Sequence, residues 1–171
     1  MSARPIRAVA GLALAVAVLA ADQLTKHLVL RHLDMGQPVE ITPFFDLVLV
    51  WNRGVSFGLL NGAGGSSPWW LIGLAGVIAA LLVAWLWRET RALPQAALWL
   101  VLAGALGNVA DRLRHGAVVD FLDFHLSGLH WPAFNVADSA IVVGAGLLLL
   151  DGLFLRRTTI GGGRGETDAR A

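Results

Sequence analysis

The residues from Trp69 to Trp87 read WWLIGLAGVIAALLVAWLW and contain no charged side chain. A transmembrane helix needs about 20 consecutive, mostly apolar residues, and this stretch has that length. Three other stretches of the chain are similarly long and apolar. We therefore predict an all-α integral membrane fold with four transmembrane helices, at about residues 6–22, 69–87, 92–111 and 136–155.

The overall composition also favours a membrane protein over a soluble one. Of the 171 residues, 56% are hydrophobic and 15% are charged, and the mean hydropathy is +0.66. Soluble domains carry roughly 25% charged residues. The net charge of +1 gives no general attraction to polyanions, so we expect no nucleic-acid partner. The chain has no cysteine, which excludes disulfides, thiol nucleophiles and cysteine-bound metals within it.

The distribution of basic residues predicts the orientation in the membrane. Eight arginines fall within only 29 residues, at 1–7, 88–93 and 156–171. Four arginines and Lys26 are spread over 71 residues, at 22–67 and 111–135. Because basic residues accumulate on the cytoplasmic side, we expect both termini in the cytoplasm. Residues 1–171 then form a single membrane domain, with a flexible cytoplasmic tail at 157–171.

The first apolar stretch has a second interpretation. Arg4 and Arg7 precede an apolar run that ends in small residues, as in a cleavable signal peptide. Cleavage would leave three spans but would not change the side on which residues 22–67 lie.

Between the spans, the sequence predicts structure outside the membrane. Residues 44–51 read FFDLVLVW, and this enrichment in β-branched and aromatic residues is typical of a strand. We expect a small β-rich extracytoplasmic cradle on the outer membrane surface. Residues 118–132 are predicted to be a membrane-surface loop, and residues 62–68 a flexible connector. Small residues four apart, at Gly76/Ala80, Ala103/Gly107 and Ala140/Gly144, either let helices approach closely or face lipid.

Most acidic side chains are expected at one depth, the outer boundary of the membrane. They are Asp22, Asp34, Glu40, Asp46, Asp111, Asp120, Asp123 and Asp138. Charge near a bilayer is costly, so such a concentration indicates a site that faces outward.

Two groups of these polar residues have both a structural and a functional interpretation. Asp22 and Lys26 are four apart and share a helix face, either as a structural ion pair or as a pair that shapes a site. A second helix face carries Asn108, Asp111, Arg112 and His115. This stripe either marks where the helix enters water, or it lets Asn108 and Arg112 bind a substrate or a partner carboxylate.

The remaining acids also allow two interpretations. Asn135 and Asp138 have the spacing of a capping box at a helix start. Asp120 is either a loop acid paired with Arg112 or Arg114, or one half of a carboxylate pair with Asp138. Two carboxylates in a partly dry site share a proton, so one can activate water while the other protonates a leaving amine. Asp123 is expected to be a solvated or pairing residue.

Five short motifs follow one another in the chain: DQLTK at 22–26, NRGVSF at 52–57, GALGNVADR at 104–112, VVDF at 118–121 and FNVADS at 134–139. Together they resemble the bacterial lipoprotein signal peptidases, also called type II signal peptidases. The resemblance covers residues 5–155 and includes the four spans. The family often has two alanines where Val55 and Ser56 stand here.

The resemblance implies an aspartic endopeptidase that removes the signal peptide from diacylglyceryl-modified prolipoproteins, cutting before the lipidated cysteine. It implies a bacterial inner-membrane location, a site at the periplasmic face, inhibition by globomycin and no metal or organic cofactor. We also expect a monomer among membrane lipids. Asp120 and Asp138 match the catalytic pair. The resemblance assigns substrate binding to Asn52, Gly54, Asn108, Arg112 and Asn135, and a supporting role to Asp22, Lys26 and Gly104.

Two other functions remain open from the sequence. A small transporter or channel would need polar residues through the full depth of the bundle, since intramembrane acids also mark ion pathways. A non-enzymatic membrane scaffold would tolerate Asp120→Asn and Asp138→Asn.

Overall fold

A computed structural model describes residues 3–54 and 68–155 of the chain. Its helices are α1 (Ala3–His32), α2 (Pro68–Arg88), α3 (Ala92–His115) and α4 (Val136–Leu150), and a short π-helical turn, η1 (Asp151–Leu155), follows α4. Within these residues, four helices are long and apolar enough to cross a membrane, as predicted. Most of the predicted connector at 62–68 and the tail at 157–171 lie outside the described residues.

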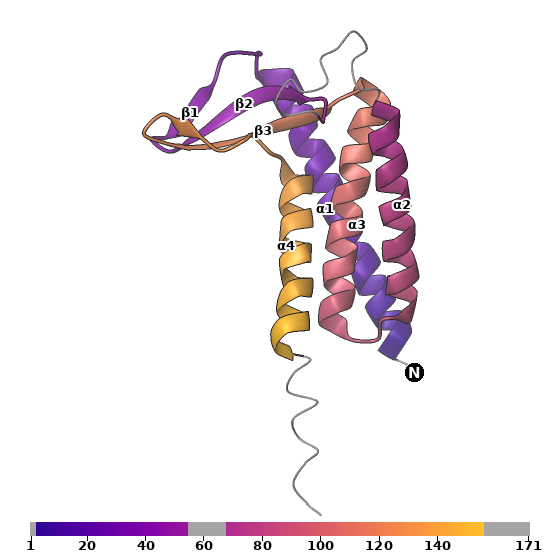
Figure 1. Ribbon diagram of the computed structural model, residues 1–171. Coiled ribbons are helices and arrows are strands. Elements are labelled where there is room, and N and C mark those ends of the chain that lie inside the picture. Colours follow the sequence, from indigo (N-terminus) through magenta and orange to yellow (C-terminus); the bar gives the residue numbers. More distant parts are fainter. Residues whose placement is uncertain (1–2, 55–67, 156–171) are drawn as a thin grey trace, which may run out of the picture.

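Helix α3 is the centre of the bundle and packs against each of the other three helices (Figure 1). Small residues permit its closest contacts. A Cβ atom on Gly104 would collide with the carbonyl oxygen of Ala137 on α4, and one on Gly144 would lie 2.7 Å from the carbonyl oxygen of Ala97. One on Gly107 would lie 2.6 Å from Asp22 Oδ2. Of the two alternatives, close packing therefore holds at Gly107 and Gly144, whereas an added Cβ atom on Gly76 would have no neighbour within 4 Å.

A small antiparallel sheet lies across one end of the bundle (Figure 1). Its strands are β1 (Val39–Thr42), β2 (Phe45–Asn52), β3 (Val118–Leu126) and β4 (Leu129–His130), in that spatial order. In the pairing of β2 with β3, Val50 lies opposite Asp120 and Asn52 opposite Val118. The sheet therefore brings a polar side chain from β2 beside an acid of β3.

The prediction of a membrane-surface loop at 118–132 was wrong for its first half, which is strand β3. Val118, Val119 and Phe121 are all buried, although successive side chains of a strand point to opposite faces. With both faces covered, the alternation that identifies a half-buried strand is missing from the sequence. The strand predicted at 44–51 was correct to within one residue at each end.

Helix α1 continues to His32, ten residues beyond the predicted end of the first span. Asp22 and Lys26 lie inside the helix with 1% and 2% of their surface exposed. Both side chains face other parts of the protein rather than water. Further along, Val29 packs with Val119 and Phe121 in the core beneath the sheet.

Polar contacts also fix the opposite end of the bundle. Arg91, which precedes α3, donates to both oxygens of Asp151 at 2.8 Å and to Glu89 Oε2 at 3.2 Å. Arg7 of α1 donates to the carbonyl oxygen of Thr90 at 2.7 Å. These contacts connect the α2–α3 turn to α1 and to the end of α4.

Candidate active site

Asp120 is held within β3 by amide groups rather than by an ion pair. Its carboxylate accepts hydrogen bonds from Asn52 Nδ2 at 2.9 Å and from Asn135 Nδ2 at 2.7 Å, and 1% of the residue is exposed. Among the described residues, Asp120 forms no ion pair with Arg112 or Arg114. Arg114 instead donates to Gln23 Oε1 at 2.6 Å. The interpretation of Asp120 as a loop acid paired with an arginine was therefore wrong.

The turn after β2 orients the amide of Asn52. The Gly54 backbone N–H donates to Asn52 Oδ1 at 2.8 Å, so the side-chain NH₂ group points to Asp120. Gly54 has a φ of +83°, a conformation that glycine adopts without the steric cost other residues incur. A Cβ atom there would also collide with the side chain of Leu71.

Asp138 lies in the first turn of α4 and forms the predicted capping box with Asn135. The Asp138 N–H donates to Asn135 Oδ1 at 2.9 Å, and the Asn135 N–H donates to Asp138 Oδ2 at 3.3 Å. Asn135 is completely buried, and its NH₂ group donates to Asp120. One buried asparagine therefore bonds to both acids, and the capping role of Asp138 coexists with its place beside Asp120.

Asn108 provides the other contact to Asp138. Its Nδ2 donates to Asp138 Oδ1 at 2.7 Å. Its Oδ1 accepts from Lys26 Nζ at 3.2 Å and from Asn135 Nδ2 at 3.3 Å. The structure thus brings together four residues that the sequence predicted as candidates for the site: Asn108, Asp120, Asn135 and Asp138.

The two acids have different surroundings. Burial raises the pKa of Asp120 from its usual 3.8 to about 6; the nearby charge of Asp138 adds to the increase, and the bonds from Asn52 and Asn135 oppose it. Asp138 is only partly buried and lies at the N-terminus of a helix, where a negative charge is favoured. With its pKa raised to about 6, Asp120 keeps a proton to higher pH than an ordinary carboxyl group does, which suits a proton donor.

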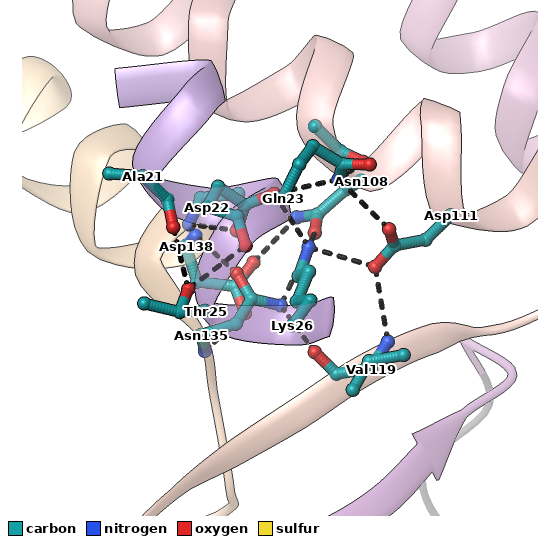
Figure 2. A network of polar contacts seen from close by, with 12 residues as sticks. Ala21, Asp22, Gln23, Thr25, Lys26, Asn108, Asp111, Val119, Asn135 and Asp138 are labelled. Atoms are coloured by element: carbon teal, nitrogen blue, oxygen red, sulfur yellow. Dashed lines mark hydrogen bonds and ion pairs between the residues drawn. The ribbon is translucent and has the colours of Figure 1, made fainter. Parts of the chain in front are cut away.

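Asp22, Lys26 and Asp111 form a buried charged cluster beside Asp138 (Figure 2), and Asp111 also bonds to the backbone of Val119, next to Asp120. Lys26 Nζ lies 2.9 Å from Asp22 Oδ2 and 2.8 Å from Asp111 Oδ2. The predicted ion pair of Asp22 and Lys26 is present, and Asp111 is a second anionic partner. Ionised side chains are rarely buried unless they are paired in this way.

The other candidate residues lie at the edge of this arrangement. Arg112 donates to the carbonyl oxygen of Asn108 at 3.4 Å, and its buried Nε has no hydrogen-bond partner in the part of the chain that the structure describes. His115 is exposed and packs beside Trp51. Asp123 binds His130 Nδ1 at 2.8 Å, which agrees with its prediction as a pairing residue. No metal-binding cluster of three or more His, Asp or Glu side chains occurs within residues 3–54 and 68–155.

Comparison with known proteins gives consistent matches. The family model described as "Signal peptidase (SPase) II" matches residues 14–154. The chain belongs to the signal peptidase II family. A lipoprotein signal peptidase of Azoarcus sp. (strain BH72) is 54% identical over 140 residues, which are 81% of this chain and 79% of the relative. One of Shewanella loihica (strain ATCC BAA-1088 / PV-4) is 46% identical over 144 residues, 83% of this chain and 85% of the relative.

Solved structures show the same fold. A bacterial membrane enzyme determined by the in meso method at 2.3 Å resolution is 28% identical, with a TM-score of 0.69 and 94% of each chain covered. A second one, at 1.9 Å, is 30% identical with a TM-score of 0.69, covering 85% of this chain and 93% of the other. This signal peptidase II chain thus shares its overall fold with solved membrane enzymes.

The structural role of Asp111 was not predicted from the sequence of this signal peptidase II chain. Besides binding Lys26, its Oδ2 accepts the Val119 N–H at 3.2 Å, and its Oδ1 accepts from Gln23 Nε2 at 3.0 Å. The one signal in the sequence was its position on the same helix face as Asn108, three residues away. That spacing identifies a shared face but not the strand and helix that cover it.

Proposed function

We propose that this chain removes the signal peptide from diacylglyceryl-modified prolipoproteins, cutting before the lipidated cysteine, and that Asp120 and Asp138 are its catalytic pair. The observation that carries the proposal is buried Asn135, in a chain belonging to the signal peptidase II family: its side chain donates to the Asp120 carboxylate, and its backbone N–H donates to the Asp138 carboxylate. Its relatives named lipoprotein signal peptidases match about four fifths of the chain.

In this mechanism the two carboxyl groups divide the proton transfers. The raised pKa of Asp120, about 6, gives it a larger protonated fraction than an ordinary carboxyl group has, and the protonated form can donate to the leaving amine. Asp138, which is partly exposed at the helix N-terminus, takes a proton from the attacking water. Asn52, Gly54, Asn108, Arg112 and Asn135 line the substrate site. No metal enters this mechanism.

The membrane arrangement belongs to the same proposal. Residues 1–171 form one four-span domain of the bacterial inner membrane, with both termini cytoplasmic and the site at the periplasmic face. The sheet is the extracytoplasmic cradle on which the extended substrate peptide lies, while the acyl chains of the substrate remain in the bilayer. We infer a monomer that is inhibited by globomycin.

The distribution of charge argues against a transporter or channel. Buried ionisable groups in the described residues lie near the two ends of the bundle, with Asp22, Lys26 and Asp111 at one end and Glu89 and Asp151 at the other. The buried α3 positions between them are apolar, including Ala97, Leu98 and Leu102. An ion pathway would need polar groups along this length.

A cleavage assay with purified protein tests the proposal. A diacylglyceryl-modified prolipoprotein should shift to the size of the mature lipoprotein on a gel, whereas the unmodified precursor should remain intact. Globomycin should block the shift, and a metal chelator should not. Equal cleavage of the unmodified precursor would refute the substrate assignment, and chelator inhibition that added zinc reverses would refute the aspartic mechanism.

A further inference from the structure

We propose that Lys26 is the positioning residue of the catalytic pair: through Asp22, Asp111 and Asn108 it fixes the locations of both Asp120 and Asp138. This inference rests on the proposed function. The resemblance to the family gives Lys26 only a supporting role with Asp22, whereas the structure connects it separately to each acid.

The first connection runs through Asp111 to Asp120. Lys26 Nζ lies 2.8 Å from Asp111 Oδ2, and the same oxygen accepts the Val119 N–H at 3.2 Å (Figure 2). Val119 directly precedes Asp120 in β3. Asp111 thus fixes the backbone at the point where the strand presents its acid.

The second connection runs through Asp22 to Asp138. Lys26 Nζ lies 2.9 Å from Asp22 Oδ2, while Asp22 Oδ1 accepts the Ala137 N–H at 2.9 Å. Ala137 directly precedes Asp138 in α4. Each catalytic acid is therefore preceded by a residue whose backbone N–H binds a carboxylate, and Lys26 pairs with both of these carboxylates.

The third connection sets the orientation of an amide. A lysine ammonium has three donors and no acceptor, so Asn108 must turn its Oδ1 toward Lys26. The NH₂ group of Asn108 then points at Asp138 Oδ1, at 2.7 Å. Asn135 Nδ2 also donates to Asn108 Oδ1, at 3.3 Å, and supports the same orientation. Loss of the ammonium would remove the charged donor of the two, so the Asn108 amide that bonds to Asp138 would be held less firmly.

The three donors of Lys26 match these three acceptors: Asp22 Oδ2, Asp111 Oδ2 and Asn108 Oδ1. An arginine keeps the positive charge, but its planar fork cannot reproduce three bonds that diverge from one nitrogen. Lys26→Arg should therefore fold without leaving the two carboxylates unpaired, and it should still misplace the acids. Lys26→Met removes the charge as well.

The test measures kcat and KM for diacylated prolipoprotein, and Tm in detergent, for Lys26→Arg, Lys26→Met and the control Arg91→Met. The control breaks the ion pairs with Glu89 and Asp151 at the other end of the bundle. A displacement of catalytic groups by about 1 Å costs on the order of 100-fold in rate, so we expect kcat of both Lys26 variants to fall by about that factor. The KM of both Lys26 variants should change little. Arg91→Met should have a lower Tm but an unchanged kcat.

A second measurement does not depend on activity. Hydrogen exchange should become faster at the Val119 and Ala137 amides in Lys26→Arg, and it should be unchanged there in Arg91→Met. This comparison separates failure of the positioning role from failure of the proposed function. Wild-type exchange rates at both amides in Lys26→Arg, or a kcat loss no larger than that of Arg91→Met at matched Tm, would overturn the inference.

Discussion

At the scale of single residues, the two acids differ because of where the backbone places them. Asp120 lies in a strand covered on both faces, and burial raises its pKa to about 6. Asp138 lies in the first turn of a helix and remains partly exposed. A carboxyl group with a raised pKa is suited to donate a proton, which is the role proposed for Asp120. The two acids thus differ in their surroundings. This difference comes from tertiary structure, and the residue type alone does not reveal it.

The pH dependence of cleavage should report on Asp120. If its protonated form donates to the leaving amine, activity should decline as the pH rises above about 6. The hydrogen bond from Asn52 favours the charged form and lowers the pKa, so Asn52→Leu should raise the pKa of Asp120. We expect the alkaline limb of kcat to move upward by about one pH unit, since a hydrogen bond to a charged group contributes about 1.5–3 kcal/mol. Asp123→Asn should leave the limb in place, and a downward shift in Asn52→Leu would contradict this role.

The sequence predicted the residues better than it predicted their contacts. The capping box of Asn135 and Asp138 and the pair of Asp22 and Lys26 were found because both are local, with fixed spacings on a helix. The contacts of Asp111 were missed because its partners come from α1 and β3, which are far away in the chain. Local spacing does not specify which distant element covers a polar helix face.

At the scale of elements, the four helices were predictable because apolar length is a strong signal. Strand β3 was not predicted, since burial on both faces removed its alternation. The first span was predicted to end at residue 22, whereas α1 continues as a helix to His32 with Asp22 and Lys26 buried inside it. Buried polar pairs and exposed polar residues look alike in a sequence.

The packing of α3 against α4 gives a test with a matched pair of glycines. Gly104→Ala places a methyl group against the Ala137 carbonyl oxygen, and overpacking of this kind costs about 1–3 kcal/mol. Gly76→Ala meets no atom within 4 Å, and alanine is favoured over glycine in a helix by about 1 kcal/mol. In detergent melts, Gly104→Ala should lower Tm, whereas Gly76→Ala should keep or raise it. Equal effects of the two substitutions would argue against the tight α3–α4 contact.

At the scale of the whole molecule, the sheet lies across one end of the bundle (Figure 1). The buried polar network lies at the same end, because Asp111 bonds both to Lys26 and to the β3 backbone. The Arg91 contacts with Glu89 and Asp151 lie at the other end. This separation fits a substrate that stays anchored in the bilayer by its acyl chains while its peptide is cut at the membrane boundary.

Reporter fusions test the orientation of the molecule. Alkaline phosphatase, which is active only outside the cytoplasm, should be active when fused after Ser127 and inactive when fused after Arg91. The excess of arginine at 1–7, 88–93 and 156–171 is the physical reason. An active fusion at Arg91 would reverse the proposed orientation.

The most direct test of the catalytic pair is cleavage of a diacylated prolipoprotein by purified Asp120→Asn, Asp138→Asn and Asp123→Asn. Asparagine nearly preserves the shape of aspartate but cannot exchange the proton that the reaction needs. We expect each of the first two variants to bind globomycin with no detectable turnover, and the double variant to be no worse, because the two groups act as a unit. Asp123→Asn should keep most of its activity, since Asp123 bonds to the exposed His130. Substantial turnover by Asp120→Asn or Asp138→Asn would contradict the assignment of these two residues as the catalytic pair.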